Sequence, residues 1–126
     1  MSSPPPNPLP DDALVVRGGQ NLPDSFANGS GVTVDAGDLL QGVSVNAAAG
    51  LSVEQLTAPN ASTGYPGIPH NQIGVTTVGA IRAAGGDVVP TPRRANPTHA
   101  TLSGITPTQA SELFRPTQPN PNRKTK

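Results

Sequence analysis

The sequence predicts a small α+β fold in which short strands and short helices form a single domain. Three observations predict it: short runs that alternate apolar and polar residues, two helix-capping motifs, and the separation of proline from glycine. Every glycine lies in the interior of the chain, whereas half of the prolines cluster at its two ends. Glycine serves turns and helix ends, and proline-rich segments stay extended. We therefore expect a domain with glycine-rich loops at residues 12–115, between flexible, disordered, proline-rich ends at 1–11 and 116–126.

The first half of the chain predicts a strand followed by a β-hairpin. Residues 13–17 form an apolar run that a pair of glycines closes, which is typical of a short strand. Residues 31–35 and 39–46 alternate apolar and polar side chains on either side of an Asp/Gly turn, and this arrangement favours a hairpin. We interpret Asp35 and Asp38 as turn residues, because a calcium loop needs further oxygen ligands and a closing glutamate that this segment lacks.

Helix starts are marked by two capping boxes. Ser52 precedes Gln55, and Thr106 precedes Gln109, by three positions, so each pair can satisfy free amides of a first helical turn. A third short helix is expected within residues 76–86, where a threonine precedes an apolar stripe and a glycine pair follows it.

Three further strands are expected at residues 72–76, 87–90 and 98–103. In the last of them, the alternation places His99 on the face opposite the core. The segment 58–71 shows no periodicity, and a loop of that length is typically functional or mobile. The total is about five short strands and three short helices, which is an α+β domain.

Composition and charge exclude several classes of protein. Without cysteine or tryptophan, and with one tyrosine and two phenylalanines, the chain offers no disulfide scaffold, no cysteine-bound zinc and no aromatic platform for single-stranded nucleic acid. The net charge is zero, but residues 1–60 hold six acidic and one basic side chain, net −5, and residues 61–126 hold two acidic and seven basic ones, net +5. Opposite charges on different faces would orient a partner.

No apolar run approaches the length of about 20 residues that a membrane span needs. The amino terminus lacks the basic and apolar regions of a secretory signal. We therefore expect a cytoplasmic protein that makes no contact with a membrane.

The two histidines, His70 and His99, are the side chains that titrate near neutral pH. Two histidines without cysteine or a nearby carboxylate are too few for a convincing zinc site, so we expect no metal. His99 as a general base, with Arg93 or Arg94 stabilising an anion, is one functional interpretation. The other is that His70 is a hydrogen-bonding loop residue and His99 a residue on the surface of the sheet.

The candidate binding residues are polar side chains at strand ends and in turns. Arg17 ends a strand beside a glycine pair, where a guanidinium group can grip a phosphate or carboxylate, or form a surface ion pair. No glycine-rich nucleotide loop with its lysine is present, so no cofactor is expected. The full set of candidates is Arg17, Asn46, His70, Asn71, Arg93, Arg94, Asn96 and His99.

Four stretches of the chain resemble those of small bacterial α+β proteins of unassigned function. They are ALVVRGG (13–19), LQGVSVN (40–46), IPHNQIGVTTVGAIR (68–82) and NPTHATLSG (96–104). The Arg-Gly-Gly after the first strand, with Ser-Val-Asn downstream, is also similar to the core strands of ADP-ribosyltransferase folds. That second resemblance lacks an acidic residue on a late strand, because Glu112 falls in a predicted helix.

We therefore expect a small cytosolic bacterial binding or accessory protein that acts by contact with another protein or with a second copy of itself. The alternative is a minimal, toxin-like enzyme that acts on a nucleotide or RNA, using Arg17, His70, Arg94 and His99. A third interpretation, binding to a nucleic-acid backbone, rests on the basic second half of the chain.

Overall fold

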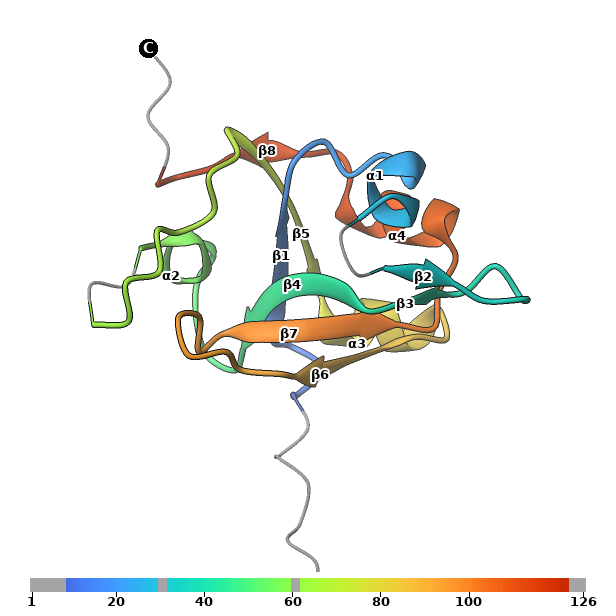
Figure 1. The fold of residues 1–126 in the computed structure, drawn as a ribbon, viewed down its shortest axis with the longest axis horizontal. Coiled ribbons are helices and arrows are strands. Elements are labelled where there is room, and N and C mark those ends of the chain that lie inside the picture. The colour runs from blue at the N-terminus through green and yellow to red at the C-terminus, as the bar shows by residue number, and fades with distance from the viewer. Residues whose placement is uncertain (1–8, 30–31, 60–61, 123–126) are drawn as a thin grey trace, which may run out of the picture.

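Six strands form one antiparallel sheet, in the order β6-β7-β4-β1-β5-β8 (Figure 1). The computed structural model describes residues 9–29, 32–59 and 62–122. The strands of the sheet are β1 (Leu14–Gly18), β4 (Val43–Ala48), β5 (Gln72–Thr77), β6 (Asp87–Pro90), β7 (His99–Ser103) and β8 (Gln118–Pro119). A separate pair is formed by β2 (Thr33–Val34) and β3 (Leu40–Gln41).

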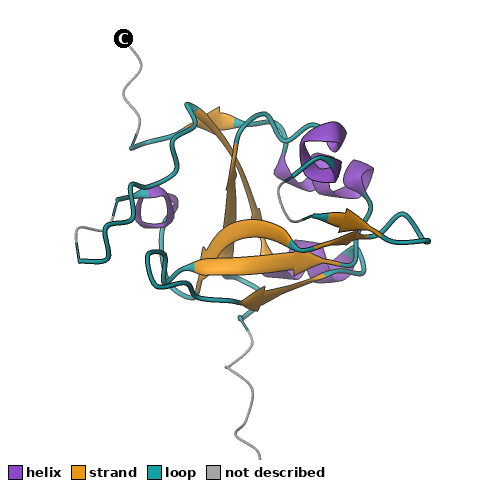
Figure 2. Cartoon of the chain, viewed as in Figure 1, coloured by secondary structure: helices purple, strands orange, loops and turns teal. Residues whose placement is uncertain are grey.

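The helices are α1 (Pro23–Ala27), α2 (Val53–Thr57), α3 (Val78–Ala83) and α4 (Pro107–Phe114). Figure 2 shows α1, α3 and α4 gathered on one side of the view and α2 apart from them. The predicted α+β class is confirmed, and the described residues contain eight strands where about five were expected.

The larger apolar cluster packs three helices against one face of the sheet. Val15 of β1 points into it, together with Phe26 of α1, Ile81 of α3 and Phe114 of α4. The rings of Phe26 and Phe114 lie 5.5 Å apart, so α1 and α4 are joined by an aromatic contact within this core.

The opposite face of the sheet is covered by α2 and by the loop that follows it (Figure 1). Val16, which strand alternation turns to this side, packs with Leu56 of α2 and Ile68 of the loop. Asn46 of β4 lies opposite Val16, and His99 of β7 lies opposite Asn46. Because opposed residues of antiparallel strands share a face, a polar pair sits on the loop-covered side of the sheet.

The predicted capping boxes are both present. Ser52 Oγ accepts the Gln55 amide at 3.1 Å, while Gln55 Oε1 accepts the Ser52 amide at 2.9 Å. Thr106 and Gln109 repeat this exchange at the start of α4. The third predicted helix is α3, and Thr77 caps it.

The predicted hairpin is present but short. Asp35 Oδ1 accepts the backbone N–H groups of Gly37 at 2.9 Å and Leu39 at 3.0 Å, and these bonds lower the pKa of the Asp35 carboxyl. The interpretation of Asp35 as a turn residue is therefore confirmed. The run 39–46 is two strands, β3 and β4, because Gly42 lies between them at φ +81° and redirects the chain.

The short helix α1 has no counterpart in the sequence prediction. Pro23 occupies its first turn, and Phe26 is its buried residue. The helix has no side-chain cap, and five residues with one large apolar side chain give no periodic pattern. Packing of Phe26 in the core, rather than a local signal, accounts for this element.

The carboxy-terminal segment also differs from expectation. A flexible tail was predicted from residue 116, but Gln118–Pro119 pairs with β5, and Asn120 is only 2% exposed. At the other end, Leu9 is buried although it falls in the predicted arm. The remaining parts of the predicted ends, residues 1–8 and 123–126, lie outside the described residues.

Prolines stand at outward-facing positions on both edges of the sheet. Directly after β6, the backbone N–H of Thr91 donates to His99 of β7. Backbone polar groups alternate in direction along a strand, so those of Pro90 and Val88 point away from β7. Pro90 has no N–H group, and the N–H of Val88 donates to its neighbour's carboxylate, Asp87 Oδ1, at 2.8 Å. In β8 the outward position is Pro119.

Candidate functional site

A cleft of about 440 Å³ opens between residues 65–70 and strands β1, β4 and β7. We call it the loop cleft. Five of the eight predicted binding residues border it, although they are far apart in the sequence: Arg17, Asn46, His70, Asn96 and His99. The fold thus brings together most of the predicted set at one place.

A glycine pair makes room for His70 at the mouth of the cleft. His70 is exposed, and its ring lies against the backbone of Gly18 and Gly19. A methyl group on Gly18 would overlap Nδ1 of His70 and come within 2.7 Å of Ile68. The glycines predicted as a strand ending therefore also allow the loop to approach β1.

Asn46 joins the sheet to both walls of the cleft. Its Nδ2 donates to the Leu56 carbonyl at 2.8 Å and to Tyr65 Oη at 3.0 Å. Its Oδ1 accepts from Asn96 Nδ2 at 2.8 Å, and Asn96 Oδ1 accepts from the Thr98 hydroxyl at 3.0 Å. Asn46 thus fixes α2, the loop and the β6–β7 connection around the cleft.

His99 lines the cleft, is held by one ring nitrogen and has the other ring nitrogen buried. Nδ1 lies 3.0 Å from the carbonyl oxygen of Thr91 and 2.9 Å from its hydroxyl. A carbonyl oxygen only accepts, which assigns the ring proton to Nδ1 and leaves a lone pair on Nε2. Among the described residues, no group forms a hydrogen bond with the buried Nε2 atom.

Burial lowers the pKa of His99 below the ordinary value of 6.5. The hydrogen bond to the Thr91 carbonyl acts in the opposite direction, and the positive charge of Arg93 adds to the lowering. His99 is therefore neutral at pH 7, with Nε2 as an acceptor.

Arg17 borders the cleft, but its charged group points to the other side of the sheet. The guanidinium donates to Asn21 Oδ1 and to the Ser25 carbonyl, each at 2.9 Å, and its carbon lies 4.3 Å from the centre of the Phe26 ring. Burial lowers the pKa of the Arg17 guanidinium below its ordinary value. These contacts tie β1 to α1, which gives the guanidinium group a structural role.

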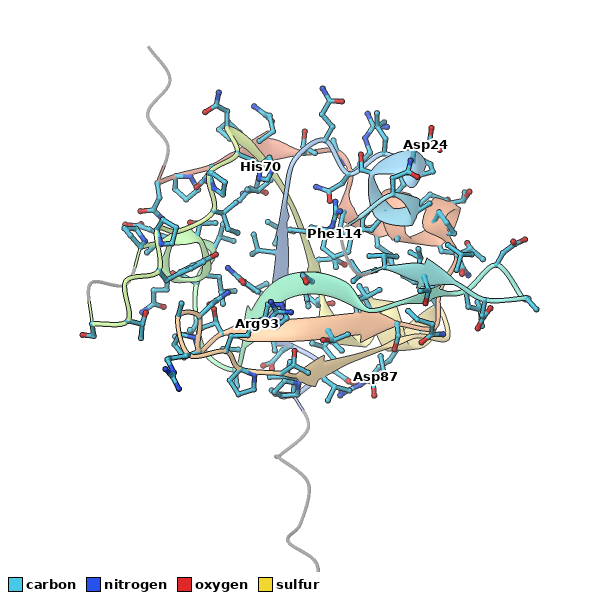
Figure 3. The ribbon with its side chains drawn as sticks, in the orientation of Figure 1. Asp24, His70, Asp87, Arg93 and Phe114 are labelled. Carbon is cyan, nitrogen blue, oxygen red and sulfur yellow. The ribbon has the colours of Figure 1, made fainter. Side chains whose placement is uncertain are left out.

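The remaining three predicted residues do not line the loop cleft. Arg93 and Arg94 are exposed in the β6–β7 connection, and Asn71 is exposed beyond the loop. Figure 3 shows His70 and Arg93 on the side of the view away from Asp24 and Asp87.

The carboxy-terminal segment holds the loop wall in place. Asn120 Nδ2 donates to the carbonyls of Ile68 and His70, both at 2.9 Å. Asn122 Nδ2 donates to the Glu54 carbonyl at 2.7 Å, which attaches the same segment to α2. The sequence analysis did not single out these asparagines, because neither lies in a recognisable motif.

Tyr65 is a further site residue that the sequence analysis missed. It borders the loop cleft and also a second hollow of about 340 Å³, and Asn96 borders both as well. A lone tyrosine in a long proline- and glycine-rich loop is the signal that singles it out.

Within residues 9–29, 32–59 and 62–122, no carboxylate lines the loop cleft, and no group of three or more His, Cys, Asp or Glu side chains is placed to hold a metal ion. No helix in this part of the chain is long and apolar enough to cross a membrane. Comparison of the chain with protein-family models, curated proteins and solved structures finds no match.

Proposed function

We propose that this is a binding or accessory protein that holds a segment of a partner protein in the loop cleft. The observation that carries the proposal is the convergence of Asn46, His70, Asn96 and His99 on one cleft. A pocket with apolar walls and a few converging polar groups is the usual form of a binding site. A cytosolic, bacterial setting, expected from the sequence, belongs to the same proposal.

The chemistry of the cleft favours binding over catalysis. Asn46 and Asn96 use their amides on each other and on the cleft walls, and the guanidinium of Arg17 is engaged by α1. In the described residues His99 has no carboxylate beside it and no hydroxyl bonded to its Nε2. A catalytic base ordinarily acts on a positioned nucleophile, and none is bonded to this one.

The shape of the site favours an extended segment of polypeptide. The loop cleft and the second hollow lie on either side of Tyr65 and Asn96, so the site has two compartments with a shared wall. An extended chain places alternate side chains in neighbouring pockets. The partner is therefore another protein, or a second copy of this chain.

A bulky residue inside the cleft tests the proposal. Ser44 is exposed and lines the cleft, whereas Thr33 is exposed on β2. Ser44→Trp should abolish co-purification of a partner at physiological salt, and Thr33→Trp should leave it unchanged. Equal recovery with both variants would contradict the assignment of the cleft.

Sedimentation of the purified protein separates the two kinds of partner. If the partner is a second copy, the isolated protein forms a dimer that Ser44→Trp dissociates. A strict monomer that also recovers no other protein would count against both forms of the proposal.

A second candidate function is a nucleotide- or RNA-directed enzyme, related in chemistry to the ADP-ribosyltransferase resemblance. The observation that favours it is that His70 and His99 border the same cleft. Arg94, which that interpretation needs, does not line the cleft. Loss of RNA cleavage or NAD turnover in His99→Ala, with an unchanged melting temperature, would establish it.

A further inference from the structure

We propose that the partner segment is acidic: an apolar side chain of the segment enters the loop cleft, and a carboxylate next to it pairs with Arg93 or Arg94 beside the cleft. The inference rests on the proposed function, because it names the chemistry of the segment that the cleft would hold.

The two arginines of the β6–β7 connection lie on a closed turn. The N–H of Arg93 donates to the Asn96 carbonyl, and the N–H of Asn96 donates to the Arg93 carbonyl, each at 3.0 Å. We call residues 93–96 the arginine turn. The Thr63 hydroxyl donates to the Ala95 carbonyl at 2.7 Å, which ties the turn to the long loop after α2. The backbone that carries both arginines is therefore held in place before a partner binds.

The arginine turn stands beside both hollows. Asn96 borders the loop cleft and the second hollow, and its side chain is fixed there by the hydrogen bond to Asn46. The positive charge of Arg93 helps to lower the pKa of His99, which is a residue of the cleft wall. A segment bound in the cleft would therefore lie close to a positive charge.

The charges of the two arginines are not compensated within the described part of the chain. Both side chains are exposed, and the ion pairs found there are those of Arg82. The sequence has no Asp or Glu between residues 55 and 86 or between residues 88 and 111, the stretches that contain the long loop and the arginine turn. None of the described carboxylates lines either hollow. A partner carboxylate would supply the missing negative charge.

The walls of the cleft favour an apolar side chain inside and the carboxylate outside. Val16, Pro66, Ile68 and Pro69 line the loop cleft, so an apolar group that enters it leaves water. A carboxylate in the same place would lose its hydration, and the guanidinium of Arg17 is already engaged by α1. The exposed arginine turn offers the carboxylate a cation without that cost.

Two cations on one short turn fit an acidic peptide better than a nucleic acid. Binding to a nucleic-acid backbone depends on the neutralisation of several phosphates by Lys and Arg. The described residues include no lysine, and Arg82 is paired with Asp11 and Asp87. One or two carboxylates of a polypeptide match the charge that the arginine turn presents.

Selection of peptides on the immobilised protein tests the inference before the partner is known. From a random heptapeptide library, the protein should enrich sequences in which Asp or Glu stands next to an apolar residue, and Ser44→Trp should not. Binding of a selected peptide should weaken when the NaCl concentration rises from about 50 mM to about 500 mM, because salt screens exposed charges. The same peptide with Asn and Gln in place of Asp and Glu should bind more weakly.

Matched variants locate the effect at the arginine turn. Arg93→Gln and Arg115→Gln each remove one positive charge, and Arg115 is exposed but lines neither hollow. Arg93→Gln should weaken binding of a selected acidic peptide about fivefold, and Arg115→Gln should leave it unchanged. Arg93→Gln combined with Arg94→Gln should abolish the preference for the acidic peptide over its amide counterpart. Because both arginines are exposed, these variants should keep the melting temperature of the natural protein.

Several results would overturn the inference. They are enrichment of neutral or basic peptides, enrichment of no peptide, and equal weakening by Arg93→Gln and Arg115→Gln. Tighter binding of a single-stranded oligouridylate than of the acidic peptides would also overturn it, and would assign the arginine turn to nucleic acid.

Failure of this inference and failure of the proposed function give different results. A partner that Ser44→Trp releases, but that Arg93→Gln combined with Arg94→Gln retains, overturns the charge selection alone. A clear preference for acidic peptides in a protein that recovers no partner supports the charge selection and overturns the accessory role.

Discussion

The side chain of Asn46 connects three parts of the wall of the loop cleft. Its amide reaches Leu56 in α2 and Tyr65 in the loop, and its oxygen accepts from Asn96. A buried group that loses its partner costs more than a typical hydrogen bond contributes. The stability of the cleft should therefore depend strongly on this residue.

We predict that Asn46→Ala lowers the free energy of unfolding by about 3 kcal/mol, because three partners are left unpaired or must find water. Urea unfolding monitored by circular dichroism measures the change. Ser44→Ala, on the same strand face but exposed, should change stability by less than about 0.5 kcal/mol. Similar values for the two variants would show that the Asn46 network contributes little.

The buried imidazole of His99 should make stability depend on pH. Burial lowers its pKa in the folded state, so the unfolded chain takes up a proton near pH 6.5 while the folded protein does not. The free energy of unfolding should therefore fall as the pH drops from 6.5 towards the lower pKa of the folded state. Above pH 6.5, His99 should contribute no pH dependence.

Denaturant unfolding between pH 5 and pH 8 checks this prediction. His99→Gln should remove the decrease that begins near pH 6.5, whereas His70→Gln, an exposed histidine at the same cleft, should preserve it. An unchanged profile in His99→Gln would assign the dependence to other groups.

At the scale of elements, the best-predicted parts are those with a local physical signal. The capping boxes at Ser52 and Thr106 were identified because their partner glutamines lie three residues away. By contrast, β8 is held by pairing with β5 and by Asn120, which bonds to residues about fifty positions earlier. Such contacts leave no pattern in the sequence around residue 118.

The candidate site was predictable to a similar extent. His99 and Asn46 follow from strand alternation, which places both on the face away from the core. The guanidinium of Arg17 is engaged by contacts with α1, and no signal in the sequence predicts that helix. The sequence could therefore suggest candidate residues, of which five border the cleft, but not which of their polar groups are already hydrogen-bonded.

The carboxy-terminal segment should control the order of the loop wall. Asn120→Ala removes two hydrogen bonds to the loop carbonyls and leaves the backbone N–H of Asn122 without its acceptor. We therefore predict that the free energy of unfolding falls by about 2 kcal/mol. Hydrogen exchange at the Ile68 amide, which donates to Thr57, should accelerate. Pro121→Ala, an exposed neighbour, serves as the control and should leave that exchange rate unchanged.

For the molecule as a whole, the fold compensates part of the charge difference between the two halves of the chain. Arg82 bonds Asp11 at 2.7 Å across that division, and it also bonds Asp87 at 3.0 Å. Arg93 lies on the opposite side of the view from Asp24 (Figure 3). The charge difference between the two halves is thus partly compensated by the ion pairs of Arg82.

The protected edge of β6 gives a prediction at this scale. Asp87→Ala combined with Pro90→Val frees the outward N–H of Val88 and adds an outward N–H at position 90. This variant should therefore form larger species than the natural protein in sedimentation velocity. Arg82→Gln combined with Pro92→Val loses the ion pair with Asp87, and the one with Asp11 as well, but leaves the edge unchanged. It should sediment like the natural protein, and larger species in this control would attribute the effect to the ion pair.

Because Pro90 and Pro119 stand at the two edges of the sheet, a partner strand finds few free backbone N–H donors there. The helix-covered face is filled by the larger apolar cluster. Under the proposed binding function, a partner would be recognised on the remaining face, and specificity would come from side chains rather than from backbone hydrogen bonds between strands. The affinity for different partners would then change strongly with single side-chain substitutions on this face. It would depend little on how readily the partner forms a β-strand.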